Sequence, residues 1–510
     1  MLFNSHIFIF LFLPVCLAGF FYLGRINREL SLFWLVLCSL FFYAWWNPIY
    51  VVLIIISMIV NYQIGQKISQ RAKNKRKWLL TIGVILDLGV IAYYKYTDFL
   101  IDTVNTVSDS SFHLHAIILP LGISFFTFQQ IAYLVDAYRD ETHEYSFLHY
   151  ALFVTFFPQL IAGPIVHHKE ILPQFMSKAS GRFNAQDFSV GITIFSIGLF
   201  KKVILADGIA EFSTPVFQAA ESGLAITFLE AWGGSLAYTL QLYFDFSGYS
   251  DMAIGLARMF GVVLPLNFDS PYKSKNIIEF WRRWHMTLSR FLRDYLYFPL
   301  GGNKLGQVKR YRNLLITMML GGLWHGAGWT FVLWGFLHGM YLVINHAWHK
   351  VLNQIGWSGD GRLTSTLAVL LTFLAVMVAW VFFRAESLDG ALNIIHGLVG
   401  LNGVVILPEY SLAAEKISQW GIPVSADETA ERLLTFSSVY WIVSLLIVAW
   451  CLPSTQDVMR KFTPALNFST TKEGGLLWQP NRRWAAVTTL LLVYAVLNLT
   501  RVSEFLYFQF

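Results

Sequence analysis

Residues 49–77 read IYVVLIIISMIVNYQIGQKISQRAKNKRK, a mainly apolar run that ends in a cluster of basic side chains. The apolar part, residues 49–66, approaches the roughly 20 residues that a helix needs to cross a bilayer. The segment that follows, residues 67–77, holds six Lys or Arg residues and no acidic one. Such a loop is expected on the cytoplasmic side of a membrane. This stretch therefore predicts a membrane-spanning helix and its orientation.

The composition of the whole chain agrees with a membrane protein. Hydrophobic residues make up 56% of the 510 positions and charged residues only 13%, whereas a soluble chain carries about 25% charged residues. Other segments that could span a bilayer lie near residues 6–24, 30–46, 78–99, 438–452 and 484–500. We therefore expect an all-α polytopic membrane protein.

The charges of the loops orient both ends of the chain. Counted from the basic loop, Arg25 and Arg28 fall on the cytoplasmic side, and residues 101–115, which have no Lys or Arg, fall outside. Residues 408–438 carry five acidic against two basic residues, whereas residues 457–483 carry five basic against two acidic ones. The first of these segments is expected outside and the second in the cytoplasm. The pattern predicts that both termini are extracytoplasmic.

The middle of the chain, residues 116–405, is less regular than its ends. Glycine, proline or charged residues interrupt its apolar runs near residues 160–164, 244–251 and 299–302. Irregular backbone at membrane depth is tolerated only where protein or a water-filled cavity covers it. We therefore expect one membrane domain, in which residues 1–115 and 406–510 flank a core of broken and re-entrant helices around a chamber.

One ionisable side chain lies among glycines and tryptophans in residues 321–329, GGLWHGAGW. Ionisable groups are costly in hydrocarbon, so His325 is a candidate for function. Histidine is also the side chain best suited to proton transfer near neutral pH. Among the remaining histidines, His338 on the next apolar run is the strongest competitor for this role.

A second candidate histidine lies in the most charged part of the chain, residues 272–312, which hold ten basic and two acidic residues. Its core, residues 280–293, reads FWRRWHMTLSRFLR. On one continuous helix, His285 would share an apolar stripe with Trp281, and the arginines would lie opposite. Arg282, Arg283 and the other arginines then either anchor an amphipathic helix at the membrane interface or bind a polyanion.

Two carboxylates lie close together in the apolar sequence YFDFSGYSD at residues 243–251. Asp245 and Asp251 could serve as general bases, as metal ligands or as partners for the arginines. No third carboxylate or suitably spaced histidine is nearby, so we expect no metal site. Because buried charges need partners, the favoured interpretation is charge pairing that orders the wall of the chamber.

Six motifs resemble, in sequence and order, those of the membrane-bound O-acyltransferase (MBOAT) family, especially its bacterial alginate O-acetyltransferase branch. They are LGISFFTF (121–128), FPQLIAGP (157–164), YFDFSGYSD (243–251), FWRRWH (280–285), GLWHG (322–326) and WVFFRA (380–385). Each motif alone is weakly specific, but six in this order are highly specific, and the resemblance extends over essentially the whole chain. It implies a fold of about 11–13 transmembrane or re-entrant helices around a central tunnel.

The resemblance also implies roles for residues. The family's catalytic histidine corresponds to His325, as general base on an acceptor hydroxyl, and its second characteristic position corresponds to His285. The expected donor is a cytoplasmic thioester, acetyl-CoA, with no bound cofactor. Expected substrate contacts are Trp281, Arg282, Arg283, Trp324, Asp245, Ser247, Tyr249 and Asp251.

The expected system is O-acetylation of an extracellular polysaccharide, such as alginate or cellulose, at the bacterial inner membrane. The implied partners are an extracytoplasmic acetyl-transfer protein of the same pathway, the polysaccharide acceptor and the lipid bilayer, and no nucleic acid. Two alternatives stay open. One is a D-alanyl transfer protein for teichoic acid that uses a carrier-protein thioester, and the other is a transporter without covalent chemistry. The alginate-type motifs and the long C-terminal extension favour the acetyltransferase.

Overall fold

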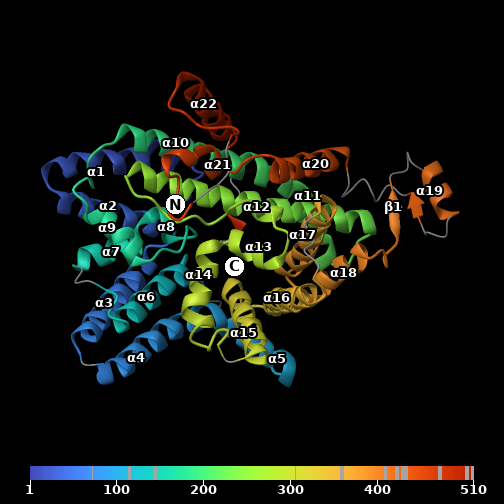
Figure 1. The fold of residues 1–510 in the computed structure, drawn as a ribbon, viewed down its shortest axis with the longest axis horizontal. Coiled ribbons are helices and arrows are strands. Elements are labelled where there is room, and N and C mark those ends of the chain that lie inside the picture. Colours follow the sequence, from blue (N-terminus) through green and yellow to red (C-terminus); the bar gives the residue numbers. More distant parts are fainter. Residues whose placement is uncertain are drawn as a thin grey trace. The chain divides into compact units, whose positions relative to one another are not determined.

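The computed structural model of the chain describes all residues except 72, 113–116, 143–145, 305, 357–360, 407–410, 420–423, 427–434, 469–473, 500–504 and 507–510. The described part is mainly helical and has almost no sheet (Figure 1). Its one sheet is a parallel pair of short strands, β1 (Val404–Ile406) and β2 (Val424–Ala426). The predicted all-α class is confirmed.

Five helices in the described residues are long and apolar enough to cross a bilayer, or six when one broken pair counts as a single span. The five are Phe8–Ile26, Ile49–Gln70, Arg76–Ser108, Ala185–Glu221 and Arg362–Arg384. Only 22% of the apolar window of the first helix is buried inside the protein. Apolar surface left open in this way suits lipid rather than water, and the chain is a multi-pass membrane protein.

The helices fall into two units, each assembled from separate segments of the chain. Unit 1 consists of residues 1–200, 248–267 and 455–509. Within it, α3 and α4 pack against α6, and α10 packs against α22. Its elements are η1 (Phe8–Phe12), α1 (Leu13–Ile26), α2 (Arg28–Ala44), α3 (Ile49–Gln70), α4 (Lys73–Ile91), η2 (Ala92–Tyr96), α5 (Thr97–Ser108), α6 (Ile123–Tyr138), α7 (Phe147–Thr155), α8 (Phe157–Leu160), α9 (His168–Met176), α10 (Ala185–Phe200), α21 (Thr455–Met459), η8 (Arg460–Phe462) and α22 (Arg482–Leu497).

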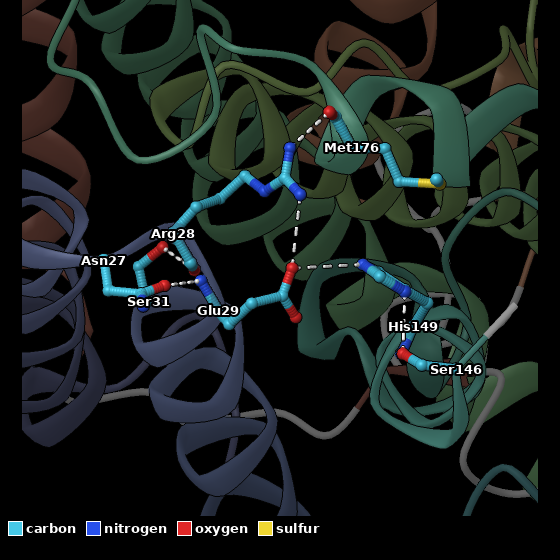
Figure 2. A network of polar contacts seen from close by, with 7 residues as sticks. All are labelled: Asn27, Arg28, Glu29, Ser31, Ser146, His149 and Met176. Carbon is cyan, nitrogen blue, oxygen red and sulfur yellow. Dashed lines mark hydrogen bonds and ion pairs between the residues drawn. The ribbon is translucent and has the colours of Figure 1, made fainter.

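Polar contacts in unit 1 tie the start of α2 to α7 and α9 (Figure 2). Arg28 donates a hydrogen bond of 2.6 Å to the backbone carbonyl of Met176 and forms an ion pair of 3.2 Å with Glu29. The carboxylate of Glu29 lies 3.8 Å from Nε2 of His149. The other ring nitrogen of His149 lies 2.7 Å from the hydroxyl of Ser146, which caps α7. These contacts tie the start of α2 to the start of α7 and to the end of α9.

Unit 2 consists mainly of residues 201–247 and 268–454. It includes the first part of α12 (Phe228–Met259), whose remainder from Gly248 onward belongs to unit 1. Its other elements are η3 (Lys201–Ala206), α11 (Asp207–Glu221), η4 (Pro271–Lys273), α13 (Ile277–Arg283), α14 (Met286–Leu292), η5 (Arg293–Tyr297), α15 (Gln307–His325), α16 (Trp329–Ile355), α17 (Arg362–Arg384), α18 (Leu388–Leu398), α19 (Ser411–Ser418) and α20 (Phe436–Cys451), with β1 and β2.

Glycines bring α15 and α16 into direct backbone contact, and Figure 1 shows the two helices side by side. A Cβ atom on Gly322 would lie 2.2 Å from the carbonyl oxygen of Phe331. A Cβ atom on Gly335 would lie 2.3 Å from the carbonyl oxygen of Met318. Small residues are typical where membrane helices pack this closely. The two helices therefore form a closely packed pair that carries the candidate site.

Most of the predicted spans near the two ends of the chain correspond to helices, with one extension. The spans predicted at residues 30–46 and 484–500 are α2 and α22, which have 17 and 16 residues. The fourth span continues through α5 to Ser108, so the first half of the predicted loop 101–115 is helical. No glycine or proline interrupts residues 97–108, and the helix ends where Asp109 adopts a left-handed conformation with φ 50°. Residues 113–115, and much of the predicted external segment 408–438, lie outside the described residues.

Two of the three predicted interruptions are found, and one is wrong. Turns occur near residues 161–163 and 298–304, as expected. Residues 244–251, however, lie inside the continuous helix α12. The charge of Asp245 does not break the helix because the ammonium group of Lys202 neutralises it at 2.7 Å. Gly248 is tolerated as well, and its carbonyl oxygen lies where α10 approaches at Gly198.

Candidate active site

His325 is the last residue of α15 and lies at the junction with α16. The helix ends because Gly326 adopts an extended conformation with φ −151°. The ring of Phe331 covers this glycine, since a Cβ atom on Gly326 would lie 2.1 Å from it. The side chain of His325 is 5% exposed. The junction therefore holds an imidazole almost completely out of solvent.

Aromatic rings from three helices surround this imidazole. Its ring centroid lies 4.8 Å from Trp324, 5.1 Å from Trp334 and 5.3 Å from Phe383. The fourth neighbour is His285, whose ring centroid is 6.3 Å away. Two histidines that are far apart in the sequence thus meet in one apolar environment. This distance is short enough for both to act on one substrate group.

The prediction that residues 280–293 form one continuous helix is wrong. The helix α13 ends at Arg283, His285 is left-handed with φ 42° and ψ 52°, and α14 begins at Met286. A left-handed non-glycine residue costs about 1–2 kcal/mol. Packing offsets this cost, because the fully buried His285 ring lies edge-on to Phe246 at 4.8 Å. The apolar stripe that grouped Trp281 with His285 therefore does not exist as one helical face.

A third histidine, His338, lies in the same aromatic cluster. It is completely buried, and its ring centroid lies 5.2 Å from Trp281 and 4.8 Å from Trp334. Trp334 also contacts His325, so its ring touches both imidazoles. Trp380 stacks on Trp334 at 5.6 Å and closes the cluster. The structure thus brings His285, His325 and the competitor His338 into one neighbourhood.

The carboxylate of Asp245 is part of a buried ion triad. The ammonium group of Lys202 lies 2.7 Å from Asp245 and 2.8 Å from Asp207. Asp245 is therefore paired, as favoured from the sequence, but with a lysine rather than with an arginine. Sequence reasoning missed Lys202, although a basic residue inside the apolar segment 185–221 is a signal that could have found it.

The other predicted substrate contacts have different environments. Trp324 lies against His325 and His285, whereas Arg282 is exposed. Arg283 forms ion pairs of 2.9 Å with Glu279 and 3.5 Å with Asp269. Arg283 is thus held by acidic neighbours, and Arg282 is the more accessible of the two guanidinium groups.

The second half of the acidic motif divides between the units. Ser247, in unit 2, is 2% exposed. In unit 1, Asp251 accepts hydrogen bonds from Thr455 at 2.6 Å and from Gln456 at 2.7 Å. Tyr249, also in unit 1, stacks on Phe3 at 5.0 Å. These contacts hold helices together in unit 1.

The chemistry that such a site can perform is acid–base catalysis. Within the described ranges, no three His, Cys, Asp or Glu side chains come together as a metal site. Buried imidazoles in an apolar environment can move a proton while water is kept away from the reacting group. A multi-pass membrane protein with this site belongs to the class of membrane-embedded transferases.

Comparison with known proteins identifies the family. The model of the MBOAT, membrane-bound O-acyltransferase family, matches residues 23–385, so the chain belongs to this family and is an acyltransferase. It is 42% identical to the peptidoglycan O-acetyltransferase of Helicobacter pylori over 100% of this chain and 98% of the relative. It is 43% identical to the "Probable alginate O-acetylase AlgI" of Pseudomonas aeruginosa over 77% of this chain and 73% of the relative. A teichoic acid D-alanyltransferase of Streptococcus thermophilus is 30% identical over 52% of this chain and 68% of the relative. The resemblance inferred from the six motifs is confirmed.

The ion triad predicts a large effect of removing its cation. Lys202→Met would leave two buried carboxylates without their counter-charge, and we expect a loss of about 3–5 kcal/mol in stability. Thermal unfolding of the purified protein in detergent measures this loss. The double variant Lys202→Met with Asp245→Asn should recover part of it, because one carboxylate fewer remains uncompensated. Independent, additive effects of the two substitutions would contradict the pairing.

Proposed function

We propose that this acyltransferase moves an acetyl group from acetyl-CoA in the cytoplasm to an extracytoplasmic glycan. The observation that carries the proposal is the buried pair His285 and His325, with ring centroids 6.3 Å apart. Similarity over the full chain to a peptidoglycan O-acetyltransferase, and similarity to an alginate O-acetylase, support acetyl as the acyl group. The acceptor is accordingly an exopolysaccharide, such as alginate or cellulose, or peptidoglycan.

In the proposed mechanism, His325 acts as the general base. It takes the proton of an acceptor hydroxyl while the hydroxyl oxygen attacks the thioester carbonyl carbon. The carbon–sulfur bond then breaks, and the leaving thiolate takes the proton back from His325. His285 orients the hydroxyl. The aromatic rings around both histidines exclude water, which would otherwise hydrolyse the thioester.

The proposed donor carries phosphates, and the basic segment offers a partner for them. Arg282 is exposed directly after Trp281, while Arg283 is engaged by Glu279 and Asp269. A planar guanidinium group suits a phosphate by forming two parallel hydrogen bonds. We therefore assign donor binding to Arg282 rather than to Arg283.

A carrier-protein thioester is the second candidate for the donor. The 30% identity to a teichoic acid D-alanyltransferase favours it, although that similarity covers only 52% of the chain. An acidic carrier protein would suit the basic segment 272–312 as well as coenzyme A does. The transporter alternative is not retained, because the chain is an acyltransferase.

In the proposed cellular setting, the orientation follows from the same loop charges as above, and the inner membrane and the partner follow from the resemblance to the alginate branch of the family. The protein lies in the bacterial inner membrane with both termini extracytoplasmic, and it hands acetyl groups to an extracytoplasmic transfer protein or directly to the glycan. The candidate contact surfaces for such a partner are the end of the predicted loop 101–115 beyond α5, which ends at Ser108, and the predicted external segment 408–438.

Removal of the proposed base should abolish transfer. We expect His325→Ala to lower the release of free coenzyme A from radiolabelled acetyl-CoA by at least about 100-fold, since it removes the proton acceptor. The assay uses purified protein in lipid with the acceptor present. His349→Ala, which removes an exposed histidine of α16, is the matched control. Normal transfer by a folded His325→Ala variant would refute the assignment.

Two substitutions separate the backbone role of His285 from the role of its imidazole. His285→Gly accepts the left-handed conformation without strain, so we expect a folded protein with little transfer activity. His285→Asn also tolerates this conformation and keeps a hydrogen-bond donor, so it should keep part of the activity. Full activity of His285→Gly at unchanged thermal stability would mean that only the backbone conformation matters.

The acceptor can be identified in cells. Deleting this chain should remove ester-linked acetyl groups from one glycan while the amount of that polymer stays the same. Acetate released by mild base from purified peptidoglycan and from purified exopolysaccharide measures the effect. Wild type should restore acetylation and His325→Ala should not. Unchanged acetate in both polymers would point to the carrier-protein alternative.

A further inference from the structure

Three rings of the aromatic cluster that contact one another carry four buried polar atoms that have no hydrogen-bond partner among the described residues. They are both ring nitrogens of His338 and the indole nitrogens of Trp281 and Trp334. His338 is 0% and Trp334 is 1% exposed. The three rings contact one another, with centroids 4.8 Å apart for Trp334 and His338, 5.2 Å for Trp281 and His338, and 5.9 Å for Trp281 and Trp334.

Such a group of atoms is costly for the folded protein. Native proteins pair nearly all buried polar groups, and an unpaired one loses its hydrogen bonds to water without replacement. Phenylalanine in place of His338 would fill similar space without that cost. Four such atoms in one cluster therefore indicate that a group from outside the chain pairs with them during function.

The chemistry of the four atoms defines this group. An indole nitrogen only donates, and a neutral imidazole offers one donor and one acceptor. The cluster thus offers three donors and one acceptor. An oxygen atom that accepts several hydrogen bonds, such as a carbonyl oxygen that gains negative charge, fits the three donors, whereas it does not pair with the acceptor nitrogen. A bound water molecule shares part of the same chemistry.

The position of the cluster favours the carbonyl oxygen. Trp334 contacts the proposed base His325 at 5.1 Å and His338 at 4.8 Å. An oxygen held by these donors would therefore be separated from His325 by no more than the ring of Trp334. Preorganised donors in a site without water are the most effective means of stabilising the oxyanion of acyl transfer.

We propose that Trp281, Trp334 and His338 bind the carbonyl oxygen of the acyl group during transfer. The inference rests on the proposed acetyl transfer and adds the site where its oxygen is held. The oxygen gains negative charge when the hydroxyl attacks, and it returns the electron pair to the carbonyl as the carbon–sulfur bond breaks. No bond to the three residues forms. Since all four atoms are covered, the ring of Trp334 turns to admit the oxygen.

The substitution His338→Phe tests the proposal, because it keeps an aromatic ring and removes both nitrogens. We expect kcat with acetyl-CoA to fall by about 10²–10³-fold, with KM changed little. The melting temperature should stay the same or rise, since two unpaired polar atoms are lost. Trp334→Phe and Trp281→Phe should also lower kcat, although the cavity left by the smaller ring lowers their melting temperature. His349→Phe and Trp348→Phe, at exposed positions of α16, are the matched controls.

Infrared spectroscopy with acetyl-CoA labelled with ¹³C at the carbonyl distinguishes the carbonyl oxygen from a structural water. The carbonyl band of the bound donor should lie at lower frequency in wild type than in His338→Phe. Equal frequencies, or a lower melting temperature with unchanged kcat, would overturn the proposal in favour of a structural role. If wild type releases no coenzyme A, the proposed function fails and this inference fails with it. If wild type is active and His338→Phe is equally active, this inference is refuted while the proposed function stands.

Discussion

The backbone contact between α15 and α16 is the constraint on which the site depends. At Gly322 and Gly335, each helix lies directly against a backbone carbonyl oxygen of the other helix. A side chain at either position would prevent this approach. Because the helices touch, the short junction between them must turn sharply, and His325 is the residue at the turn. The close pair also places Trp334 against His325, while His338 contacts the same ring from one turn further along α16. Without this contact, the imidazoles of His325 and His338 would not both contact the ring of Trp334.

The second histidine reaches the site by a different physical route. His285 lies at a break between two short helices, in a conformation that most residues avoid. Its ring and that of Trp284 enter the aromatic cluster, where Trp284 lies 5.0 Å from Trp380. Strain of this kind persists only where surrounding packing over-determines the conformation, and it is concentrated at functional sites. The break therefore presents His285 to His325, which a continuous helix from residue 280 to 293 would not do.

The sequence was sufficient for the class of fold, because hydrophobic run length is a local signal. It also singled out, as ionisable residues in apolar surroundings, two histidines that the structure brings near each other. The sequence was insufficient where packing between residues distant in the chain determines the local conformation. The helical wheel failed at His285 since tertiary aromatic contacts override local helical periodicity. The expected break near Asp245 failed because the neutralising Lys202 comes from a distant helix, and pairing between distant residues is not readable from one chain. The prediction of a loop at residues 101–108 failed for a simpler reason. These residues contain no glycine or proline that would end the preceding helix.

The distribution of charge around the site has a common physical basis. Acidic and basic groups inside the apolar part of unit 2, such as Asp245 and Lys202, neutralise each other, as burial in a low dielectric requires. The histidines, in contrast, are packed against aromatic rings. A neutral imidazole can accept a proton from a hydroxyl, whereas a protonated one cannot. The same dry environment strengthens every hydrogen bond to an oxygen that gains charge. The permanent charges are therefore paired with each other, and the imidazoles lie among aromatic rings. This arrangement serves both proton transfer and the stabilisation of negative charge.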